Sequence, residues 1–170
     1  YYQMKSFKAK VLITGGCGYI GSHTAALLLQ RGYDIVILDS NINSNPKVLD
    51  RIKKIAKSFN KNQNIKISFH KGDLRDYKFV KKVFEKENIS NTRIGFVIHF
   101  AGMKSVSESV INPLKYWDFN VNGSINLLKI MLENDCKNII FSSSATVYDV
   151  QNGSTINEST KTNPQSPYGQ

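Results

Sequence analysis

The chain has 170 residues, of which 41% are hydrophobic, and this is enough for one domain with a substantial core. Its net charge is +10, and its longest apolar runs (residues 11–13 and 35–38) are too short to cross a bilayer. Cys17 and Cys136 lack metal-ligand spacing and a disulfide framework, so we expect reduced thiols, no metal and a cytoplasmic protein without a membrane partner.

The first part of the chain alternates between strand and helix patterns. Residues 10–14 are a β-branched run that ends in glycines, which predicts a buried strand. Residues 22–31, rich in alanine and leucine and closed by Gly32, predict a helix. Residues 33–40 predict a second strand, and Pro46 is well placed to open the basic helix that follows.

The basic helix carries much of the excess positive charge. Its lysines alternate at helical spacing with apolar residues, namely Val48, Leu49, Ile52, Ile55 and Phe59. The pattern is typical of an amphipathic helix with a solvated face. Its charged side has no interleaved aromatic residues, as base stacking would require, so we expect no nucleic-acid partner.

The second part of the chain continues the alternation. Residues 64–69 predict a third strand, 77–87 a helix and 95–100 a fourth strand. Residues 113–133 predict a long helix and 137–141 a fifth strand.

Strands that alternate with helices in this way predict an α/β fold with a doubly wound parallel sheet, the Rossmann arrangement that binds NAD. We assign residues 8–170 to this domain and residues 1–7 to a cloning remnant and N-terminal extension. In such sheets the ligand lies beyond the carboxyl ends of the strands, where the glycine-rich turns fall.

The segment TGGCGYIGSH joins the first strand to the first helix. Gly15, Gly18 and Gly21 are spaced G-x-x-G-x-x-G, a variant of the dinucleotide fingerprint. Such glycines allow a tight turn, close approach to a pyrophosphate and close packing of helix on strand. Asp39 ends the second strand, where a carboxylate accepts both ribose hydroxyls and repels a 2′-phosphate, so the sequence predicts NAD rather than NADP.

Three further residues near these strand ends have two interpretations each. Asp73 follows the third strand and either bonds the adenine amino group or caps the next helix, and the residues alone leave both open. Cys17 lies near a helix N-terminus that can lower a thiol pKa, although a small residue filling a turn is the simpler interpretation. His99 ends a strand and is interpreted as a packing or supporting residue rather than a ligand.

With these residues in place, the segments HFAGMKSV, FSSSATVY and SPYG complete a pattern. The chain resembles the extended short-chain dehydrogenase/reductases, and among them the family of UDP-glucose (or UDP-galactose) 4-epimerases, over residues 8–169. Several motifs carry the superfamily resemblance, whereas the epimerase branch rests mainly on HFAGMKSV and SSSATVY.

The resemblance implies roles for particular residues. Ser144 and Tyr168 would be the catalytic pair, and with Lys104 they would bind substrate. It also favours the adenine role of Asp73. The implied NAD-binding residues are Gly15, Gly18, Tyr19, Ile20, Gly21, Asp39, Asn41, Asn43, Ser44, Asp73, Leu74, Phe100, Ala101, Gly102, Lys104, Asn120 and Tyr168.

The sequence departs from the family pattern at a few positions. A cofactor-contacting asparagine of some members maps to Phe119, where the neighbouring Asn120 can substitute. Members often have leucine and alanine at Met103 and Ser105, and glycine at Asp149. These changes affect individual contacts rather than the assignment.

The implied reaction interconverts UDP-glucose and UDP-galactose through a 4-keto sugar, with Tyr168 as base and Ser144 bonded to the same sugar oxygen. A free tyrosine hydroxyl has a pKa of about 10, and in the superfamily a lysine four residues later lowers it. That lysine would be the second residue beyond Gln170. Because the family is roughly twice this length, we expect the chain to be cut before its substrate domain and the 170 residues to be inactive alone.

Other functions remain open. Another NAD-dependent extended enzyme could act on a nucleotide sugar as a decarboxylase or a 4,6-dehydratase, but a dehydratase needs an acidic pair where Ala145 and Thr146 stand. A non-catalytic NAD-binding redox sensor would have no use for Ser144 with Tyr168. By analogy with the family, whose long helix often forms a dimer contact, we expect a homodimer.

Overall fold

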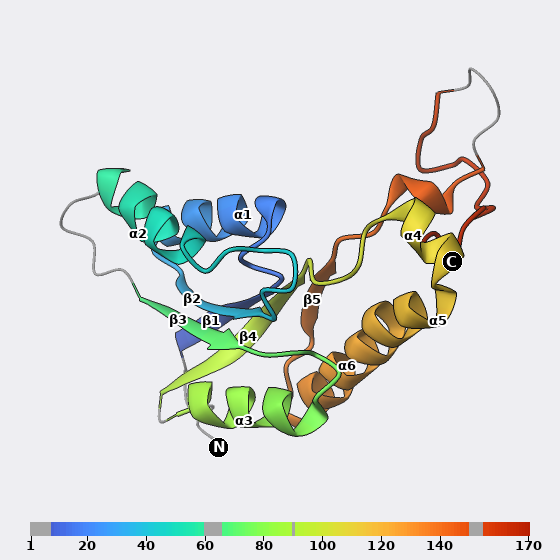
Figure 1. Cartoon of the computed structure of the whole chain (residues 1–170). Helices are drawn as coiled ribbons and strands as arrows, with labels where there is room; N and C mark the ends of the chain where they lie inside the picture. The colour runs from blue at the N-terminus through green and yellow to red at the C-terminus, as the bar shows by residue number, and fades with distance from the viewer. Residues whose placement is uncertain (1–7, 60–65, 90, 150–154) are drawn as a thin grey trace.

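The computed structural model describes residues 8–59, 66–89, 91–149 and 155–170, and within these residues five parallel strands form one sheet in the order β3-β2-β1-β4-β5 (Figure 1). The strands are β1 Lys8–Thr14, β2 Asp34–Asp39, β3 Ile67–Lys71, β4 Thr92–His99 and β5 Asn138–Phe141. The order reverses between β1 and β4, which opens a crevice at their carboxyl ends. The predicted doubly wound parallel sheet is confirmed.

Helices cover both faces of the sheet. The helices α1 (Tyr19–Gln30) and α2 (Val48–Phe59) lie on one face, while α3 (Tyr77–Glu87) and α6 (Gly123–Glu133) lie on the other (Figure 1). All six residues of β2 are buried, as expected for an inner strand covered on both sides. Its side chains alternate between two cores, with Val36 and Leu38 in the α3–α6 core and Ile35 and Ile37 in the α1–α2 core.

The basic helix α2 is amphipathic, as predicted. Ile52 and Ala56 are buried against α1 and the sheet, whereas Ile55 and Phe59 are exposed together with the lysines. In the described part of the chain, no helix combines the length and the apolar composition that crossing a bilayer requires.

The helix predicted over residues 113–133 is more complex in the structure. It consists of α5 (Pro113–Tyr116), a π-helical turn η1 (Trp117–Asn122) and α6, with helical backbone at each junction. A π-helical turn inserts one extra residue into the helical repeat and changes the direction of the side chains that follow. Apolar periodicity does not reveal such an insertion, so the sequence predicts an uninterrupted helix instead.

A short helix, α4 (Val106–Ile111), was not predicted because its sequence VSESVI is too short and polar to show a helical period. The sequence feature that could have revealed this helix is its N-cap, because the Ser105 hydroxyl accepts a hydrogen bond from the Glu108 amide. The short 3-10 helix η2 (Ala145–Val147) was not predicted either, and the other elements differ from expectation only at their ends. The helix α1 starts at Tyr19, three residues early, and part of the predicted strand 64–69 lies outside the described residues.

A buried charge cluster joins β1, β3 and α3. The Glu87 carboxylate accepts hydrogen bonds from Lys10 Nζ at 3.0 Å and from His70 Nε2 at 2.7 Å. Burial alone would raise the pKa of Glu87, but hydrogen bonds from His70, Lys10 and Ser68 outweigh it and lower that pKa. The three side chains of the cluster are at most 15% exposed, so each charge depends on its partners for solvation.

We predict that Glu87→Ala lowers the free energy of unfolding by about 3 kcal/mol, because it leaves the Lys10 ammonium group buried without a counter-charge. Urea unfolding followed by circular dichroism measures the effect. Glu133→Ala is the matched control, since Glu133 joins the exposed pair with Lys81 and should cost less than about 1 kcal/mol. Equal losses in the two variants would contradict the prediction.

Candidate functional site

A cavity of about 320 Å³ lies at the carboxyl ends of the strands, where the sheet order reverses. Most of the predicted cofactor residues line it: Gly15, Gly18, Tyr19, Ile20, Gly21, Asp39, Asn43, Asp73, Leu74, Phe100, Ala101, Gly102 and Lys104. It is also lined by residues that sequence reasoning missed or assigned no contact: Leu38, Ser40, Ile42, Gly72, Met103, Phe119 and Ser142. These additional residues follow predicted strands or stand beside predicted ligands, and that proximity was the only available signal.

The glycine turn forms one wall of this cavity. Gly15 has a φ of +67°, and a Cβ there would lie 2.8 Å from the Ala101 nitrogen. A Cβ at Gly21 would lie 2.4 Å from the Gly15 carbonyl oxygen, so helix and turn pack with no room for a side chain. The N-cap of helix α1 is Gly18, so the helix has no side-chain cap, and it has no acidic residue in its first turn. Its first amides are therefore available to an anion in the cavity.

Asp39 is held in one orientation by groups of the loop around it. Its Oδ1 accepts hydrogen bonds from the Asn41 amide and the Ser44 hydroxyl, both at 2.8 Å, and its Oδ2 accepts one from the Cys17 amide at 2.9 Å. Asn41 also donates from Nδ2 to Ser44 Oγ. Asn41 and Ser44, predicted to contact the cofactor, do not line the cavity but orient Asp39, which does.

Cys17 lies under the glycine turn with its side chain buried. Burial, together with the nearby Asp39 carboxylate, raises the pKa of the Cys17 thiol to about 11 despite a hydrogen bond from Asn41 that lowers it. The thiol is therefore protonated at neutral pH. This favours the interpretation of Cys17 as a small residue that fills the turn over that of a thiol activated by the helix N-terminus.

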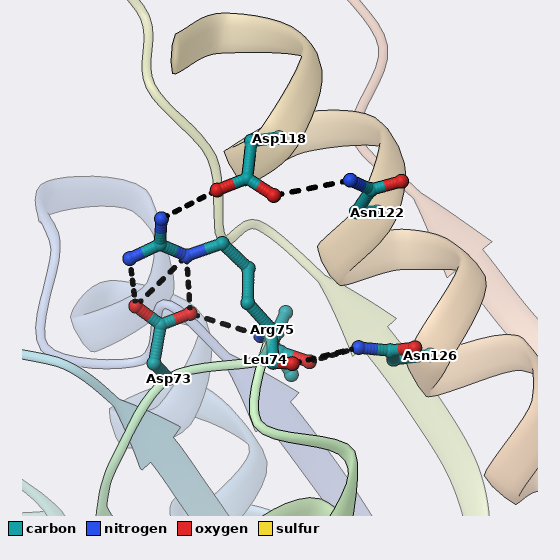
Figure 2. A network of polar contacts seen from close by, with 6 residues as sticks. All are labelled: Asp73, Leu74, Arg75, Asp118, Asn122 and Asn126. Atoms are coloured by element: carbon teal, nitrogen blue, oxygen red, sulfur yellow. Dashed lines mark hydrogen bonds and ion pairs between the residues drawn. The ribbon is translucent and has the colours of Figure 1, made fainter.

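Asp73 does not cap the helix that follows it. That cap is Asp76, whose carboxylate accepts a hydrogen bond from the Phe79 amide at 3.0 Å. Asp73 lines the cavity instead, and its carboxylate is bound by the guanidinium group of Arg75 (Figure 2). Of the two interpretations that the sequence leaves open, capping is wrong.

Asn120 supports the cavity from behind. Its side chain pairs with the backbone of Met103, accepting from the amide at 2.7 Å and donating to the carbonyl at 3.0 Å. This pairing fixes the segment that contains Gly102 and Lys104. The structure therefore brings Asn120 close to the predicted ligands but does not put it in the cavity wall.

His99 connects this support to β1 through a chain of hydrogen bonds. Ser124 Oγ donates to the Asn120 carbonyl at 2.5 Å, so it accepts from His99 Nε2 at 2.8 Å. His99 Nδ1 is therefore an acceptor, and Thr14 Oγ1 donates to it at 2.6 Å. The histidine is held as the neutral Nε2–H tautomer. Burial first, and Lys104 second, lower the pKa of His99 to about 4.

Ser144 and Tyr168 lie outside the wall of the 320 Å³ cavity. Ser144 Oγ accepts from the Thr146 amide and caps the short 3-10 helix η2 (Ala145–Val147). The Tyr168 amide donates to Ser109 Oγ at 3.2 Å, and its ring packs edge-on against Tyr116. The two segments are in contact, since a Cβ at Gly169 would lie 2.6 Å from the Thr146 carbonyl oxygen.

Within the described residues, no group of three or more candidate ligands has the geometry of a metal site.

The family profile described as GDP-mannose 4,6 dehydratase matches residues 12–170. The chain belongs to this family. It is 45% identical to UDP-glucose 4-epimerase 2 of Arabidopsis thaliana over 159 residues, which are 94% of this chain and 43% of the plant protein. The chain thus spans less than half the length of this relative. The predicted resemblance to the extended short-chain dehydrogenase/reductases, and to the UDP-glucose 4-epimerases among them, is confirmed.

Two solved structures share the fold. UDP-glucose 4-epimerase from Bifidobacterium longum, in complex with NAD⁺ and UDP, matches with a TM-score of 0.83 and 41% identity over 95% of this chain and 45% of that one. The enzyme from Stenotrophomonas maltophila, with bound NAD and formylated UDP-arabinopyranose, has a TM-score of 0.82 and 39% identity, and covers 95% of this chain and 44% of that one. Both proteins bind a nicotinamide cofactor and a uridine nucleotide.

We predict that His99 makes stability fall as the pH drops from about 6.5 toward about 4. Its pKa is lower in the folded state than in the unfolded state, so the unfolded state binds more protons in this window and acid favours unfolding. Urea midpoints of wild type and His99→Gln, compared between pH 7 and pH 5, measure the effect, which should be smaller in the variant. His23→Gln removes a more exposed imidazole and should retain the wild-type dependence. Parallel curves for wild type and His99→Gln would contradict the prediction.

Proposed function

We propose that this chain forms the NAD-binding half of an enzyme that interconverts UDP-glucose and UDP-galactose. One observation carries the proposal: a single cavity collects the glycine turn, Asp39, Asp73 and Lys104 at the edge of the sheet where order reverses. The names of the relatives and the cofactors bound to the solved structures support the same reaction. Because the chain covers 43% of a relative, we expect the uridine nucleotide to contact residues beyond it.

The groups that line the cavity suit the parts of a dinucleotide. The uncapped start of α1 offers amides to a pyrophosphate, and the fixed Asp39 carboxylate offers two acceptor oxygens to a ribose. The loop that follows Asp39 reads SNINSN and so contains no arginine that could bind a 2′-phosphate. NAD fits these residues better than NADP.

When bound, NAD⁺ would accept the hydride from carbon 4 of the sugar and return it to the opposite face. The chain's own groups would handle the proton. The phenolate form of Tyr168 would take the proton of the 4-hydroxyl group and give it back when the hydride returns, and the Ser144 hydroxyl would bond to the same oxygen as its charge changes. The buried Ser109 and Tyr116 hold the backbone and the ring of Tyr168 and so fix its approach.

We expect Tyr168→Phe to lower kcat by about 10²–10⁴-fold, because it removes the general base, and Ser144→Ala to lower it by about 10²–10³-fold. The complete gene product is incubated with UDP-galactose and a trace of NAD⁺, and UDP-glucose is quantified by chromatography. Tyr33→Phe, which alters a remote and exposed tyrosine, is the control and should retain full activity.

The products separate this reaction from its alternatives. Net epimerisation consumes no NAD⁺, so NADH should not accumulate. Stoichiometric NADH would instead indicate a dehydrogenase, and a 4-keto-6-deoxy sugar would indicate the dehydratase chemistry in the name of the family profile. No sugar conversion together with tight NAD⁺ binding would favour a redox sensor.

We also propose that the protein is a homodimer that acts in the cytoplasm, without a membrane or nucleic-acid partner. Apolar side chains recur every three or four residues along α5, η1 and α6, and each is at least 36% exposed: Leu114, Trp117, Val121, Ile125, Leu128 and Leu132. This stripe is long enough to pack against the same stripe of a second copy. Two free, buried cysteines fit a reducing compartment.

We predict that Leu128→Arg weakens the dimer at least about tenfold, because it places a charge at the centre of the stripe. Sedimentation velocity of the complete gene product over a range of concentrations measures the monomer fraction. Leu27→Arg, at an exposed leucine of α1 on the other face of the sheet, is the matched control and should sediment as wild type. A monomeric wild type, or a Leu128→Arg protein that remains dimeric, would contradict the proposal.

A further inference from the structure

Arg75 binds two carboxylates, one from its own loop and one that is 43 positions away in the sequence (Figure 2). Its guanidinium group contacts Asp73 through Nε at 3.1–3.2 Å and through Nη2 at 2.7 Å, which is a bidentate pair. Its Nη1 contacts Asp118 Oδ2 at 2.6 Å. Asp118 belongs to the π-helical turn η1, so one side chain joins the loop after β3 to the segment that follows α5.

The same guanidinium group lies over the ring of Phe119, with 3.5 Å between Arg75 Cζ and the ring centroid. Asp73 and Phe119 both line the cavity, whereas Arg75 does not. Arg75 therefore lies behind the cavity wall and contacts two of its residues at once. Such a position fixes side chains that a ligand touches, without Arg75 touching the ligand itself.

We propose that Arg75 is a positioning residue that fixes Asp73 and Phe119 as two sides of an adenine pocket and makes the pocket selective for a purine with a 6-amino group. The inference rests on the proposed NAD-binding function. It adds a reason for the selectivity, and it assigns a role to a residue that does not touch the cofactor.

The selectivity follows from hydrogen-bond chemistry. An ionised carboxylate only accepts hydrogen bonds, so it pairs with the amino group of adenine but repels the 6-oxygen of hypoxanthine. Discrimination of this kind is large only if the acceptor cannot turn away from the wrong partner. The Asp73 side chain is 29% exposed. Without the guanidinium group it keeps the hydrogen bond from the Arg75 backbone amide to Oδ1 at 2.9 Å, but Oδ2 loses its partners and is free to turn toward water. The hydrogen bonds from Arg75 also lower the pKa of Asp73, against the effect of burial, and keep it ionised.

The backbone of this loop has supports that do not involve the Arg75 side chain. Asn126 Nδ2 donates to the carbonyl of Leu74 at 3.2 Å and to that of Arg75 at 3.0 Å (Figure 2). Asn122 Nδ2 donates to Asp118 at 3.0 Å. Because these contacts survive when the guanidinium group is removed, we expect an Arg75 variant to fold with its loop in place and to change mainly the orientation of Asp73 and Phe119.

The test measures dissociation constants for NAD⁺ and for nicotinamide hypoxanthine dinucleotide, which differ only in the 6-substituent of the purine. Isothermal titration of the complete gene product, stripped of cofactor, supplies both constants. The variants are Arg75→Met, which keeps the length of the side chain without its charge, and Arg75→Lys, which keeps the charge without the planar fork. Lys81→Met is the matched control, because Lys81 pairs with Glu133 on the outside of α3 and α6.

We expect wild type and Lys81→Met to prefer NAD⁺ by at least about tenfold. Arg75→Met should bind NAD⁺ about tenfold more weakly with little change for the hypoxanthine analogue, so its preference falls to within about twofold. Arg75→Lys should lie between the two. A merely structural role would weaken both dinucleotides equally and leave the ratio unchanged, and that result in either variant overturns the proposal. Should Arg75→Met fail to fold, the ratio measured for Arg75→Lys decides alone.

The wild-type measurements separate this inference from the proposed function. A wild type that binds neither dinucleotide overturns both. A wild type that binds NAD⁺, with a purine selectivity that either Arg75 variant retains in full, overturns only the role of Arg75. Equal wild-type affinity for the two dinucleotides also leaves NAD binding intact and overturns the selective adenine pocket.

Discussion

The turn after β1 passes so close to the end of β4 that a Cβ at Gly15 would lie 2.8 Å from the Ala101 nitrogen. This approach brings the start of α1 next to the segment that contains Gly102 and Lys104, and it closes one side of the cavity. The cavity also depends on the reversal of strand order between β1 and β4. At such a reversal the connections that leave the two strands run to opposite faces of the sheet, which leaves room for a ligand between them. The other walls are built around this contact.

A layer of polar side chains holds those walls from outside the cavity. Asn41 and Ser44 orient Asp39, Arg75 binds Asp73, and Asn120 pairs with Met103. The bonds to Asp39 from Asn41 and Ser44 and the bond of Arg75 to Asp73 are local. Asn120 and Arg75 also connect separate elements, since Asn120 contacts Met103 and Arg75 contacts Asp118. Because this layer fixes the wall residues before a ligand binds, these residues lose little conformational entropy on binding. The neutral, buried His99 joins the layer to β1 and makes part of it sensitive to acid.

The sequence predicted the strands and most helices because their patterns are local. A β-branched run of four to six residues, or an apolar face at helical spacing, is visible within one segment. The glycine spacing and the acid that ends β2 likewise belong to short motifs with a known mechanical role. The π-helical turn and the short helix α4 were missed because an inserted residue and a single helical turn barely alter the pattern of apolar residues.

By itself, then, the sequence determined the doubly wound sheet, the glycine turn and the positions of Asp39 and Asp73 at the ends of their strands, since propensity and periodicity depend on neighbours along the chain. Only the tertiary structure decided what those carboxylates contact. It assigned the cap of α3 to Asp76, moved Asn41, Ser44 and Asn120 behind the wall, and paired Arg75 with Asp118 across 43 positions of sequence. The contacts of Arg75 with Asp118 and of Asn120 with Met103 form when separate elements pack together, and no local pattern specifies which polar group will meet which partner across the fold.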